Sequence, residues 1–336
     1  MEILAFGVQA DEKPLIERAF AELHEDVRCL DVFLNADTAA IAAGHEVIST
    51  SVNAQLDAEV LQTLAAGGTK MIAQRSTGFN NIDLDVAGRL GLTVARVSYY
   101  SPYSVAEFAW TLAMAVNRRV VRAANRTRDF DFRLDGLMGR DLHGRTAGVI
   151  GTGRIGEAFT RIAHGFGMRL LGLDVAPNPV CGELGMTYVD DKHELLAAAD
   201  LVSLHVPLLP ATRHLIGARE LRAMKDDAIL VNSSRGGLID SEALVGELRK
   251  GRFLGVGLDV YEAEAGLFFL DKSMEAVDDD TLARLMTFPN VLVTSHQAYY
   301  TADAVAQIVD TTARNIGDHI AGRRGENVLV PAAPTP

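Results

Sequence analysis

The sequence is poor in cysteine, which limits the classes of protein it can belong to. Its 336 residues include only two cysteines, Cys29 and Cys181, and these form no C-x-x-C pair or other metal-ligand spacing. Two isolated thiols are typical of a reducing compartment rather than of a disulfide framework. The sequence therefore predicts a cytoplasmic protein without a metal site.

Basic residues are also scarce relative to acidic ones, and long apolar runs are missing. The chain has 32 Lys and Arg against 44 Asp and Glu, a net charge of −12. A chain of this charge is not expected to bind nucleic acid or an anionic membrane surface. The longest lipophilic stretch, Phe108–Val116, is too short to span a bilayer, and the N-terminus has no basic segment or cleavage site of a signal peptide. We therefore expect no nucleic acid and no membrane as partner.

Strand-like and helix-like segments alternate along the whole chain, which is long enough for two domains. Such alternation is typical of parallel α/β folds. The expected strands are Glu2–Val8, Glu46–Ser51, Met71–Ser76, Thr93–Val97, Ala147–Ile150, Leu201–His205, Ala228–Asn232, Leu254–Asp259 and Val291–Thr294. The expected helices include Leu56–Ala66, Glu194–Ala199, Ser241–Lys250, Thr281–Met286 and Ala302–Ala321.

One longer helix is predicted from a capping box. Ser104 and Glu107 have the spacing at which each side chain can bond the backbone N–H of the other. We expect a helix to start here and to run to about Asn125. The segment Asn117–Arg128 is rich in arginine, and we interpret it as a solvated or subunit-facing surface rather than a nucleic-acid site.

The segment from Thr146 to Asp174 carries the strongest functional signal. A strand-like run leads into Gly151, Gly153 and Gly156 in the spacing G-x-G-x-x-G. A helix-like segment follows, and then a second apolar run ends on Asp174, 18 residues after the last glycine. This order suits a dinucleotide, whose pyrophosphate needs a tight turn, close backbone approach and a helix N-terminus. The acid suits a ribose 2′-hydroxyl and repels a 2′-phosphate, which favours NAD over NADP. The alternative is an ordinary strand–helix turn without a ligand.

The position of this motif predicts the domain organisation. The motif begins near residue 150, so a complete α/β unit precedes it, and the last expected helix follows the final strand. We expect a dinucleotide-binding domain at residues 102–298, inserted in a split substrate domain at residues 1–101 and 299–336. Both are expected to be Rossmann-like or flavodoxin-like parallel α/β domains, with a ligand cleft between them.

Polar residues stand at the ends of three expected strands in the second half, where doubly wound sheets bind ligands. Arg235 could clamp a carboxylate bidentately or pair with a local acid such as Asp240. Asp259 could accept a hydrogen bond from a nicotinamide, and Glu264 could hold an imidazole. His296 follows the last strand, where a histidine can donate a proton near neutral pH. Metal binding by the acids is the rival interpretation, but no histidine is interleaved with them.

Three of these residues together suit the reduction of a 2-keto acid. Arg235 would hold the carboxylate and polarise the ketone, and His296 as imidazolium would protonate the forming alkoxide. Glu264 would orient the imidazole and stabilise its charged form. The hydride chemistry would belong to the nicotinamide cofactor.

The tracts GTGRIG, NSSRGGLID, GLDVYEAE and TSHQAYYT resemble the NAD-dependent D-2-hydroxyacid dehydrogenase family. Within that family, RSTGFNNIDLDVA, NRTRDFDFRLDGL, DVYEAEAGLFF and SHQAYYT make the chain most similar to the fermentative D-lactate dehydrogenases. The resemblance implies the split two-domain fold, an Arg/Glu/His catalytic set of Arg235, Glu264 and His296, and a homodimer or homotetramer. It implies substrate contacts from Ser76, Thr77, Gly78, Tyr100 and Tyr299. The NAD site that it implies consists of Gly151, Gly153, Arg154, Ile155, Gly156, Asp174, Val206, Pro207, Ser233, Asp259 and Ala298.

Departures from the family pattern leave the substrate open. Where relatives often have V-P-A-Y-S-P, residues 97–102 of this chain are V-S-Y-Y-S-P. The first proline of the pattern is therefore absent, and a second aromatic residue is present. We expect pyruvate, with hydroxypyruvate, glyoxylate, oxaloacetate and phenylpyruvate as alternatives. A formate dehydrogenase would have Gln in place of Glu264, a phosphoglycerate dehydrogenase would need basic residues for the phosphate, and an NAD(H)-sensing binding protein would turn over little substrate.

Overall fold

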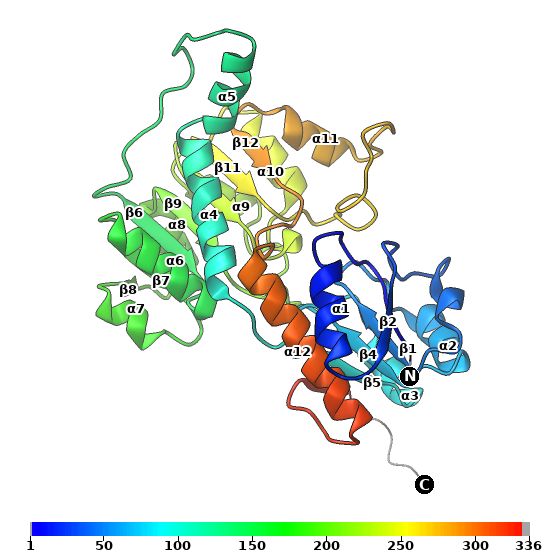
Figure 1. Cartoon of the computed structure of the whole chain (residues 1–336). Coiled ribbons are helices and arrows are strands. Elements are labelled where there is room, and N and C mark those ends of the chain that lie inside the picture. The colour runs from blue at the N-terminus through cyan, green and yellow to red at the C-terminus, as the bar shows by residue number, and fades with distance from the viewer. Residues whose placement is uncertain (1, 331–336) are drawn as a thin grey trace. The chain divides into compact units, whose positions relative to one another are not determined.

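The chain forms two compact units, whose elements are labelled in Figure 1. The structure is a computed structural model and describes residues 2–330. Unit 1 contains residues 1–101 and 301–336, and unit 2 contains residues 102–300. Residues 331–336 of the predicted substrate domain lie outside the described residues. No described helix is long and apolar enough to cross a membrane.

Unit 1 is built on a six-stranded sheet with the order β13-β5-β4-β3-β1-β2. The strands are β1 (Glu2–Ala5), β2 (Asp26–Cys29), β3 (Val47–Thr50), β4 (Met71–Gln74), β5 (Thr93–Arg96) and β13 (Val328–Val330). Strands β1 to β5 pair in parallel in the flavodoxin-like order, as predicted. Strand β13 pairs antiparallel with β5 at the edge.

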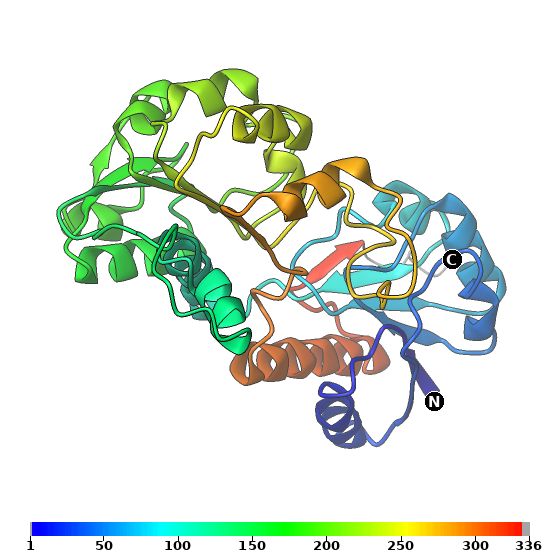
Figure 2. The same ribbon diagram turned by 90° about the horizontal axis from the view of Figure 1, so that it is seen from above.

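Helices cover both faces of this sheet (Figure 2). They are α1 (Lys13–Ala21), η1 (Ala39–Ala42), α2 (Ala58–Ala66), α3 (Leu84–Arg89) and α12 (Ala302–Ile320). Helices α1 and α12 lie side by side on one face, and their buried side chains include Phe20 and Ile316. Helices α2 and α3 cover the other face, with Leu61 and Ala87 in the core. Because α12 follows unit 2 in the chain, unit 1 is completed only by the C-terminal segment.

Unit 2 is built on a parallel seven-stranded sheet with the order β12-β11-β10-β9-β6-β7-β8. The strands are β6 (Thr146–Ile150), β7 (Arg169–Leu173), β8 (Thr187–Tyr188), β9 (Leu201–Leu204), β10 (Ile229–Asn232), β11 (Gly255–Leu258) and β12 (Val291–Val293). The strand order reverses between β6 and β9, the Rossmann arrangement with a seventh strand. In such sheets ligands bind at the carboxyl ends of the strands on either side of the reversal.

Helices also cover both faces of the unit 2 sheet. They are α4 (Pro102–Asn117), α5 (Val120–Arg128), α6 (Arg154–Gly165), α7 (Pro179–Glu183), α8 (Lys192–Ala198), α9 (Ala218–Ala223), η2 (Gly236–Leu238), α10 (Ser241–Leu248) and α11 (Asp280–Thr287). Helices α4 and α6 pack on one face around Trp110 and Phe159. Helices α8 to α11 supply apolar side chains such as Leu196, Leu244 and Leu285 to the other face.

Apart from the long helix expected from Ser104, the expected strands and helices are present, mostly with shorter ends, and β7 is the apolar run that ends on Asp174. Three further strands, β2, β8 and β13, were not expected. Strand β2 alternates charged residues with partly buried ones, and β8 and β13 span two and three residues. Segments so short or so polar carry too little hydrophobic periodicity to be recognised in a sequence. The antiparallel β13 also shows that the unit 1 sheet is mixed at its edge rather than parallel throughout.

The long helix predicted from Ser104 to Asn125 is wrong, because this segment forms two helices. Helix α4 begins at Pro102, so Ser104 lies inside its first turn instead of capping it. Helix α4 ends at Asn117, and Arg119 then adopts φ 53° and ψ 32°. This left-handed conformation cannot continue a right-handed helix.

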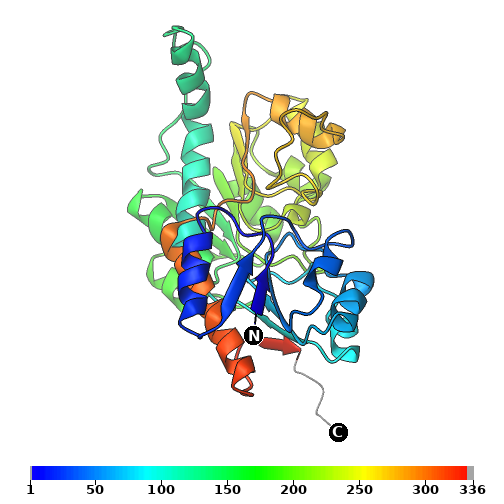
Figure 3. The same cartoon turned by 45° about the vertical axis from the view of Figure 1, so that its right-hand side comes forward.

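A contact distant in sequence accompanies the break. The buried Asn117 side chain accepts a hydrogen bond from the backbone N–H of Arg140 at 3.1 Å and donates one to its carbonyl at 2.8 Å. These bonds fix the end of α4 to the chain that returns from α5. Helix α5 itself buries none of its residues, and Figure 3 shows it extending beyond the rest of unit 2.

Candidate active site

The glycine turn between β6 and α6 has the geometry that a dinucleotide needs. Gly151 has φ +91°, and a Cβ there would lie 2.6 Å from the carbonyl oxygen of His205. A Cβ on Gly156 would overlap the carbonyl of Gly151. Gly153 instead caps the twelve-residue α6 and has no atom within 4 Å of its Cβ position. Two glycines are therefore required by the turn itself, while Gly153 leaves open space where a pyrophosphate can approach a helix N-terminus.

Asp174 at the end of β7 is bonded to the same turn. Its Oδ2 accepts hydrogen bonds from the backbone N–H of Thr152 at 2.5 Å and from the Thr152 hydroxyl at 3.2 Å. The Tyr188 hydroxyl, on neighbouring β8, donates to Thr152 Oγ1 at 2.9 Å. These contacts hold a carboxylate beside the glycine turn, where Rossmann sites bind ribose hydroxyls. The sequence analysis missed Thr152 and Tyr188, because the link between them exists only once β6, β7 and β8 are paired.

The other residues predicted for NAD binding gather at the same edge of the sheet. Since the strands are parallel, residues that follow β6, β9, β10, β11 and β12 share one edge. Arg154 and Ile155 begin α6 beside the turn. The Ser233 hydroxyl is buried and has no hydrogen-bond partner within residues 2–330. The predicted residues at the remaining strand ends are Val206 and Pro207 after β9, Asp259 after β11 and Ala298 after β12.

His205 directly follows β9, and its backbone carbonyl lies against Gly151 of the glycine turn. Its Nε2 lies 2.9 Å from the Ser203 hydroxyl, and its ring centroid lies 5.1 Å from that of Phe159 on α6. Burial lowers the pKa of His205 to about 3, so the ring is neutral at pH 7. A neutral packed imidazole here suits a structural role rather than that of a proton donor.

His296 and Glu264 form a hydrogen-bonded pair in unit 2. The imidazole Nδ1 lies 2.8 Å from Glu264 Oε1, and the two side chains are 12% and 25% exposed. The other Glu264 oxygen accepts from the backbone N–H of Tyr261 at 3.0 Å, which fixes the carboxylate. With Nδ1 engaged, Nε2 is the ring atom left for a ligand.

Asp259 fixes the loop that carries His296. Its buried carboxylate accepts from the Thr294 hydroxyl at 2.6 Å and from the backbone N–H groups of Gln297 and Ala298 at 3.0 and 2.8 Å. Burial raises the pKa of Asp259, and these three hydrogen bonds oppose that shift. The His296 backbone N–H donates to the Asp259 carbonyl at 2.6 Å, and His296 has φ 54°. A left-handed non-glycine residue is held there by its surroundings, as is common at functional sites.

Arg235 follows β10, and its guanidinium is not neutralised by a neighbouring acid. Its Nη1 donates to the carbonyl of Ser234 at 2.7 Å, and within residues 2–330 it forms no ion pair. Asp240, the alternative partner considered from the sequence, instead caps α10 by accepting from the backbone N–H of Ala243 at 2.9 Å. A Cβ on the next residue, Gly236, would overlap the backbone of Tyr261, so this close approach requires glycine. Arg235 is thus available to bind an anion.

The predicted substrate residues are divided between the units. Ser76, Thr77, Gly78 and Tyr100 belong to unit 1, whereas Tyr299 belongs to unit 2. Tyr299 packs edge-on against Tyr300, with ring centroids 5.7 Å apart. A substrate site that combines these residues stays a prediction. Among the described residues, no group of three or more His, Cys, Asp or Glu is arranged to hold a metal ion.

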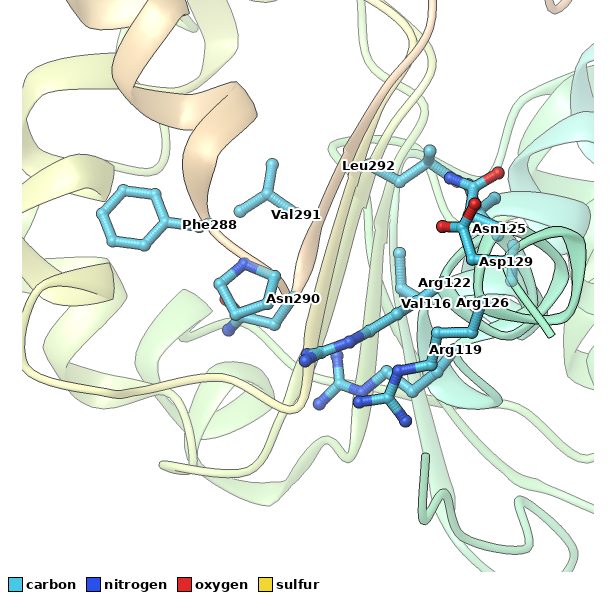
Figure 4. A pocket seen from close by; sticks show the side chains of 13 residues that line it. Val116, Arg119, Arg122, Asn125, Arg126, Asp129, Phe288, Asn290, Val291 and Leu292 are labelled. Carbon is cyan, nitrogen blue, oxygen red and sulfur yellow. The ribbon is translucent and has the colours of Figure 1, made fainter. Parts of the chain in front are cut away.

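A pocket of about 390 Å³ lies elsewhere in unit 2, between the α4–α5 break and the amino end of β12. It is lined by Ala115, Val116, Arg119, Val121, Arg122, Asn125, Arg126, Asp129, Phe288, Pro289, Asn290, Val291 and Leu292. Figure 4 shows the arginines on one side of this arginine pocket and Phe288 on the other. Because His296 follows the opposite end of β12, the arginine pocket is separate from the candidate active site.

Comparison with known proteins assigns the family. Residues 110–298 match the family model described as "D-isomer specific 2-hydroxyacid dehydrogenase, NAD binding domain". The chain belongs to the D-isomer specific 2-hydroxyacid dehydrogenases. It is therefore an NAD-dependent dehydrogenase, which confirms the family and the cofactor predicted from the sequence.

Curated relatives and solved structures match nearly the whole chain. The D-lactate dehydrogenase kk1H of Curvularia clavata is 47% identical, over 91% of this chain and 87% of its own. The D-lactate dehydrogenase of Escherichia coli is 42% identical, over 98% of this chain and 100% of its own. The structure titled "Identification of the pyruvate reductase of Chlamydomonas reinhardtii" has a TM-score of 0.92 at 39% identity and covers 97% of this chain and 98% of its own.

The glycine turn gives a prediction that separates folding from cofactor binding. Gly156→Ala should lower the unfolding temperature, because the added Cβ collides with backbone that cannot move freely. Gly153→Ala should unfold like the wild type, since its Cβ enters open space, but should weaken NADH binding at least about tenfold by blocking the pyrophosphate. Thermal unfolding and NADH fluorescence titration measure the two effects. Unchanged NADH affinity in Gly153→Ala would mean that the pyrophosphate does not approach this glycine.

Proposed function

We propose that this dehydrogenase reduces a short 2-keto acid, with pyruvate as the preferred substrate, to the D-2-hydroxy acid. The observation that carries the proposal is the 2.8 Å hydrogen bond between His296 and Glu264 at the strand edge that also bears Arg235. A 2-keto acid needs one cation for its carboxylate and one acid for its ketone oxygen, and these residues offer both. Relatives named D-lactate dehydrogenase and a neighbour described as a pyruvate reductase support pyruvate.

Each of the three residues has a distinct task in this proposal. The guanidinium of Arg235 binds the substrate carboxylate bidentately and lies near the ketone oxygen as negative charge develops there. His296 donates a proton from Nε2 to that oxygen, and in the reverse direction it accepts the proton. Glu264 holds the ring through Nδ1 and offsets the positive charge of the protonated imidazole. NAD, when bound, supplies the hydride chemistry.

The cofactor site in this proposal is the one predicted from the sequence. The three glycines and the first turn of α6 hold the pyrophosphate, and Asp174 binds the adenosine ribose. The unpartnered hydroxyl of Ser233 and the strand-end residues Val206 and Pro207 lie at the same sheet edge as the turn. Asp259 and Ala298 also belong to this set, although within the protein they already bond to each other.

The substrate and its stereochemistry can be tested together. We expect purified enzyme to consume NADH with pyruvate at a kcat/KM at least about tenfold above that for hydroxypyruvate, glyoxylate, oxaloacetate and phenylpyruvate. Chiral analysis should identify the product as D-lactate. A higher kcat/KM for a larger keto acid would contradict pyruvate as the preferred substrate but would leave the proposed reaction class unchanged. Binding of NADH without turnover of any 2-keto acid would instead favour a cofactor-sensing protein.

We also propose that the chain is a homo-oligomer assembled through unit 2. The segment after α5, residues 129–138, exposes large apolar side chains: Phe130 at 82%, Phe132 at 70%, Leu134 at 82% and Met138 at 88%. Exposed apolar clusters of this kind mark interaction sites. The segment also carries Asp135, which forms no ion pair in the described part of the chain, and Asp131, which is already paired with Arg126 and Arg133. Arg119 and Arg122 in the arginine pocket form no ion pair within residues 2–330. In this assembly the apolar segment of each copy enters the arginine pocket of the other.

This assembly can be tested by a charge placed on the segment. Phe132→Asp should lower the mass measured by light scattering from that of a dimer or tetramer to that of a smaller species, because it buries a charge in the contact. Met274→Asp is the matched control, since Met274 lies in the same unit and is 95% exposed. A wild-type monomer, or a Phe132→Asp variant of unchanged mass, would contradict the proposed contact.

We further propose that the enzyme works in the cytoplasm. Cys29 and Cys181 are both free thiols, and burial raises the pKa of each. Unpaired thiols are typical of reducing compartments.

A further inference from the structure

Unit 2 contains another histidine–carboxylate pair, which the proposed mechanism does not use. Glu262, two residues before Glu264 in the chain, lies 2.8 Å from Nε2 of His214. Because an ionised carboxylate only accepts hydrogen bonds, the imidazole donates from Nε2. The other Glu262 oxygen accepts from the backbone N–H of Ser241, the first residue of α10, at 3.2 Å. One carboxylate therefore joins a side chain and a helix N-terminus that are distant in sequence.

These two bonds are the strong contacts of the Glu262 carboxylate. Its side chain is 20% exposed, so the bonds are largely shielded from water. The remaining charged neighbour is Arg213, whose Nη2 lies 3.9 Å from Oε2 of Glu262 and whose side chain is 63% exposed. An exposed ion pair at this distance contributes little. The position of the carboxylate is thus determined by its bonds to His214 and Ser241.

Both groups that Glu262 binds also hold the turn between β10 and α10, which carries Arg235. The backbone N–H of His214 donates to the carbonyl of Gly237, within this turn, at 2.8 Å. His214 therefore binds the turn through its backbone and Glu262 through its ring. Ser241 is the residue at which the turn enters α10. The turn is held at its middle and at its end by groups that converge on one carboxylate.

The same turn lies directly against the loop that follows β11. A Cβ on Gly236 would overlap the backbone of Tyr261 and Glu262. The backbone N–H of Tyr261 in turn donates to the carboxylate of Glu264 at 3.0 Å. Glu262 therefore lies where the turn between β10 and α10 meets the loop that carries Glu264.

The backbone of His214 is strained in a way that this network explains. His214 has φ 50°, a left-handed conformation that is uncommon for residues other than glycine. Such a residue persists where its surroundings hold it. Here the ring bond to Glu262 and the backbone bond to Gly237 hold it from two sides. His214 is thus fixed in the orientation that connects the carboxylate to the turn.

We propose that Glu262 and His214 are positioning residues for Arg235. They hold the turn between β10 and α10 so that the Arg235 guanidinium meets the carboxylate of the 2-keto acid in a bidentate geometry. This inference rests on the proposed function, because that function assigns the carboxylate to Arg235. Neither residue touches the substrate, and both act through the backbone of the turn. Since a clamp that is displaced by about 1 Å loses much of its effect, substrate binding and turnover depend on this pair.

The first test compares Glu262→Ala with the wild type. Kinetics with pyruvate are combined with calorimetric binding of oxamate, a pyruvate isostere that cannot be reduced, to the NADH-bound enzyme. Glu262→Ala should lower kcat/KM and the affinity for oxamate about 10- to 100-fold, the scale on which misplaced groups reduce rates. The affinity for NADH should not change, because the glycine turn after β6 lies on a different strand end.

Glu220→Ala is the matched control. Glu220 accepts from the backbone N–H of Gly217 at 3.2 Å and lies 3.4 Å from Nε2 of His193. It therefore makes the same two kinds of contact as Glu262, but at the start of α9 rather than at the Arg235 turn. Glu220→Ala should bind oxamate and reduce pyruvate like the wild type.

Two milder variants grade the effect. Glu262→Gln should stay within about threefold of the wild type, the scale of one altered hydrogen bond. Its amide oxygen can accept from Ser241, and its NH2 group can donate to Nε2 of a neutral His214 that carries its proton on Nδ1. His214→Asn tolerates the left-handed backbone but loses the ring bond, so it should lie between Glu262→Gln and Glu262→Ala.

Coupling to Arg235 separates positioning from a general loss of stability. Arg235→Lys keeps the charge but lacks the fork that binds a carboxylate bidentately. Adding Glu262→Ala to Arg235→Lys should therefore lower the affinity for oxamate less than about threefold further, since the geometry that Glu262 maintains is already lost. A residue with a merely structural role would reduce the affinity by the same factor in both backgrounds.

The outcomes separate this inference from the proposed function. Folded Glu262→Ala enzyme with kcat/KM and oxamate affinity within about twofold of the wild type would overturn the inference. Equal losses with Arg235 and with Arg235→Lys would overturn it too, as would an equal loss in Glu220→Ala or a wild type that binds no oxamate. If thermal unfolding shows that Glu262→Ala is not folded, His214→Asn is judged by the same criteria. A wild type whose oxamate binding depends on Arg235 and Glu262, but which reduces no 2-keto acid, would refute the proposed function and leave the positioning role standing.

Discussion

Parallel pairing in the sheet of unit 2 is the constraint on which the functional site depends. Because every strand of this sheet runs the same way, the glycine turn after β6 and the polar segments after β9, β10, β11 and β12 all emerge at one edge. Gly151 and His296 are far apart in the sequence, yet the strand order brings their segments to the same edge. The reversal between β6 and β9 opens the space that parallel sheets use for ligands. One pattern of backbone hydrogen bonds thus brings the glycine turn and the proposed catalytic residues to the same edge.

At that edge, two acids, Asp259 and Glu264, determine the orientation of a single imidazole. Asp259 accepts hydrogen bonds from the Thr294 hydroxyl and from the backbone N–H of Ala298, just after β12. Glu264 bonds the imidazole ring of His296 itself. The left-handed backbone of His296 is tolerated because these bonds determine the path of the loop. These bonds determine the path of the loop without a ligand, and in the proposed mechanism this reduces the reorganisation needed during proton transfer.

Much of this site could be predicted from the sequence, because its signals are local. The spacing of Gly151, Gly153 and Gly156 after an apolar run determines a turn, and polar residues such as Arg235 at a strand end share an edge in any parallel sheet. What escaped prediction depends on contacts between distant segments. The break after α4 accompanies the bonds between Asn117 and Arg140, and the antiparallel β13 is defined by its pairing with β5. No periodic pattern reports such pairings.

The central claim is that His296, held by Glu264, is the proton donor, and single-turnover kinetics test it most directly. His296→Asn suits the test because asparagine tolerates the left-handed backbone of this position. When the His296→Asn variant is saturated with NADH and mixed with pyruvate, its rate of NADH oxidation should be at least about 100-fold below that of the wild type. Its affinity for NADH should be unchanged. His164→Asn, an exposed histidine of α6, should react like the wild type. A His296→Asn rate within about tenfold of the wild type would contradict the account, because another group would then supply the proton.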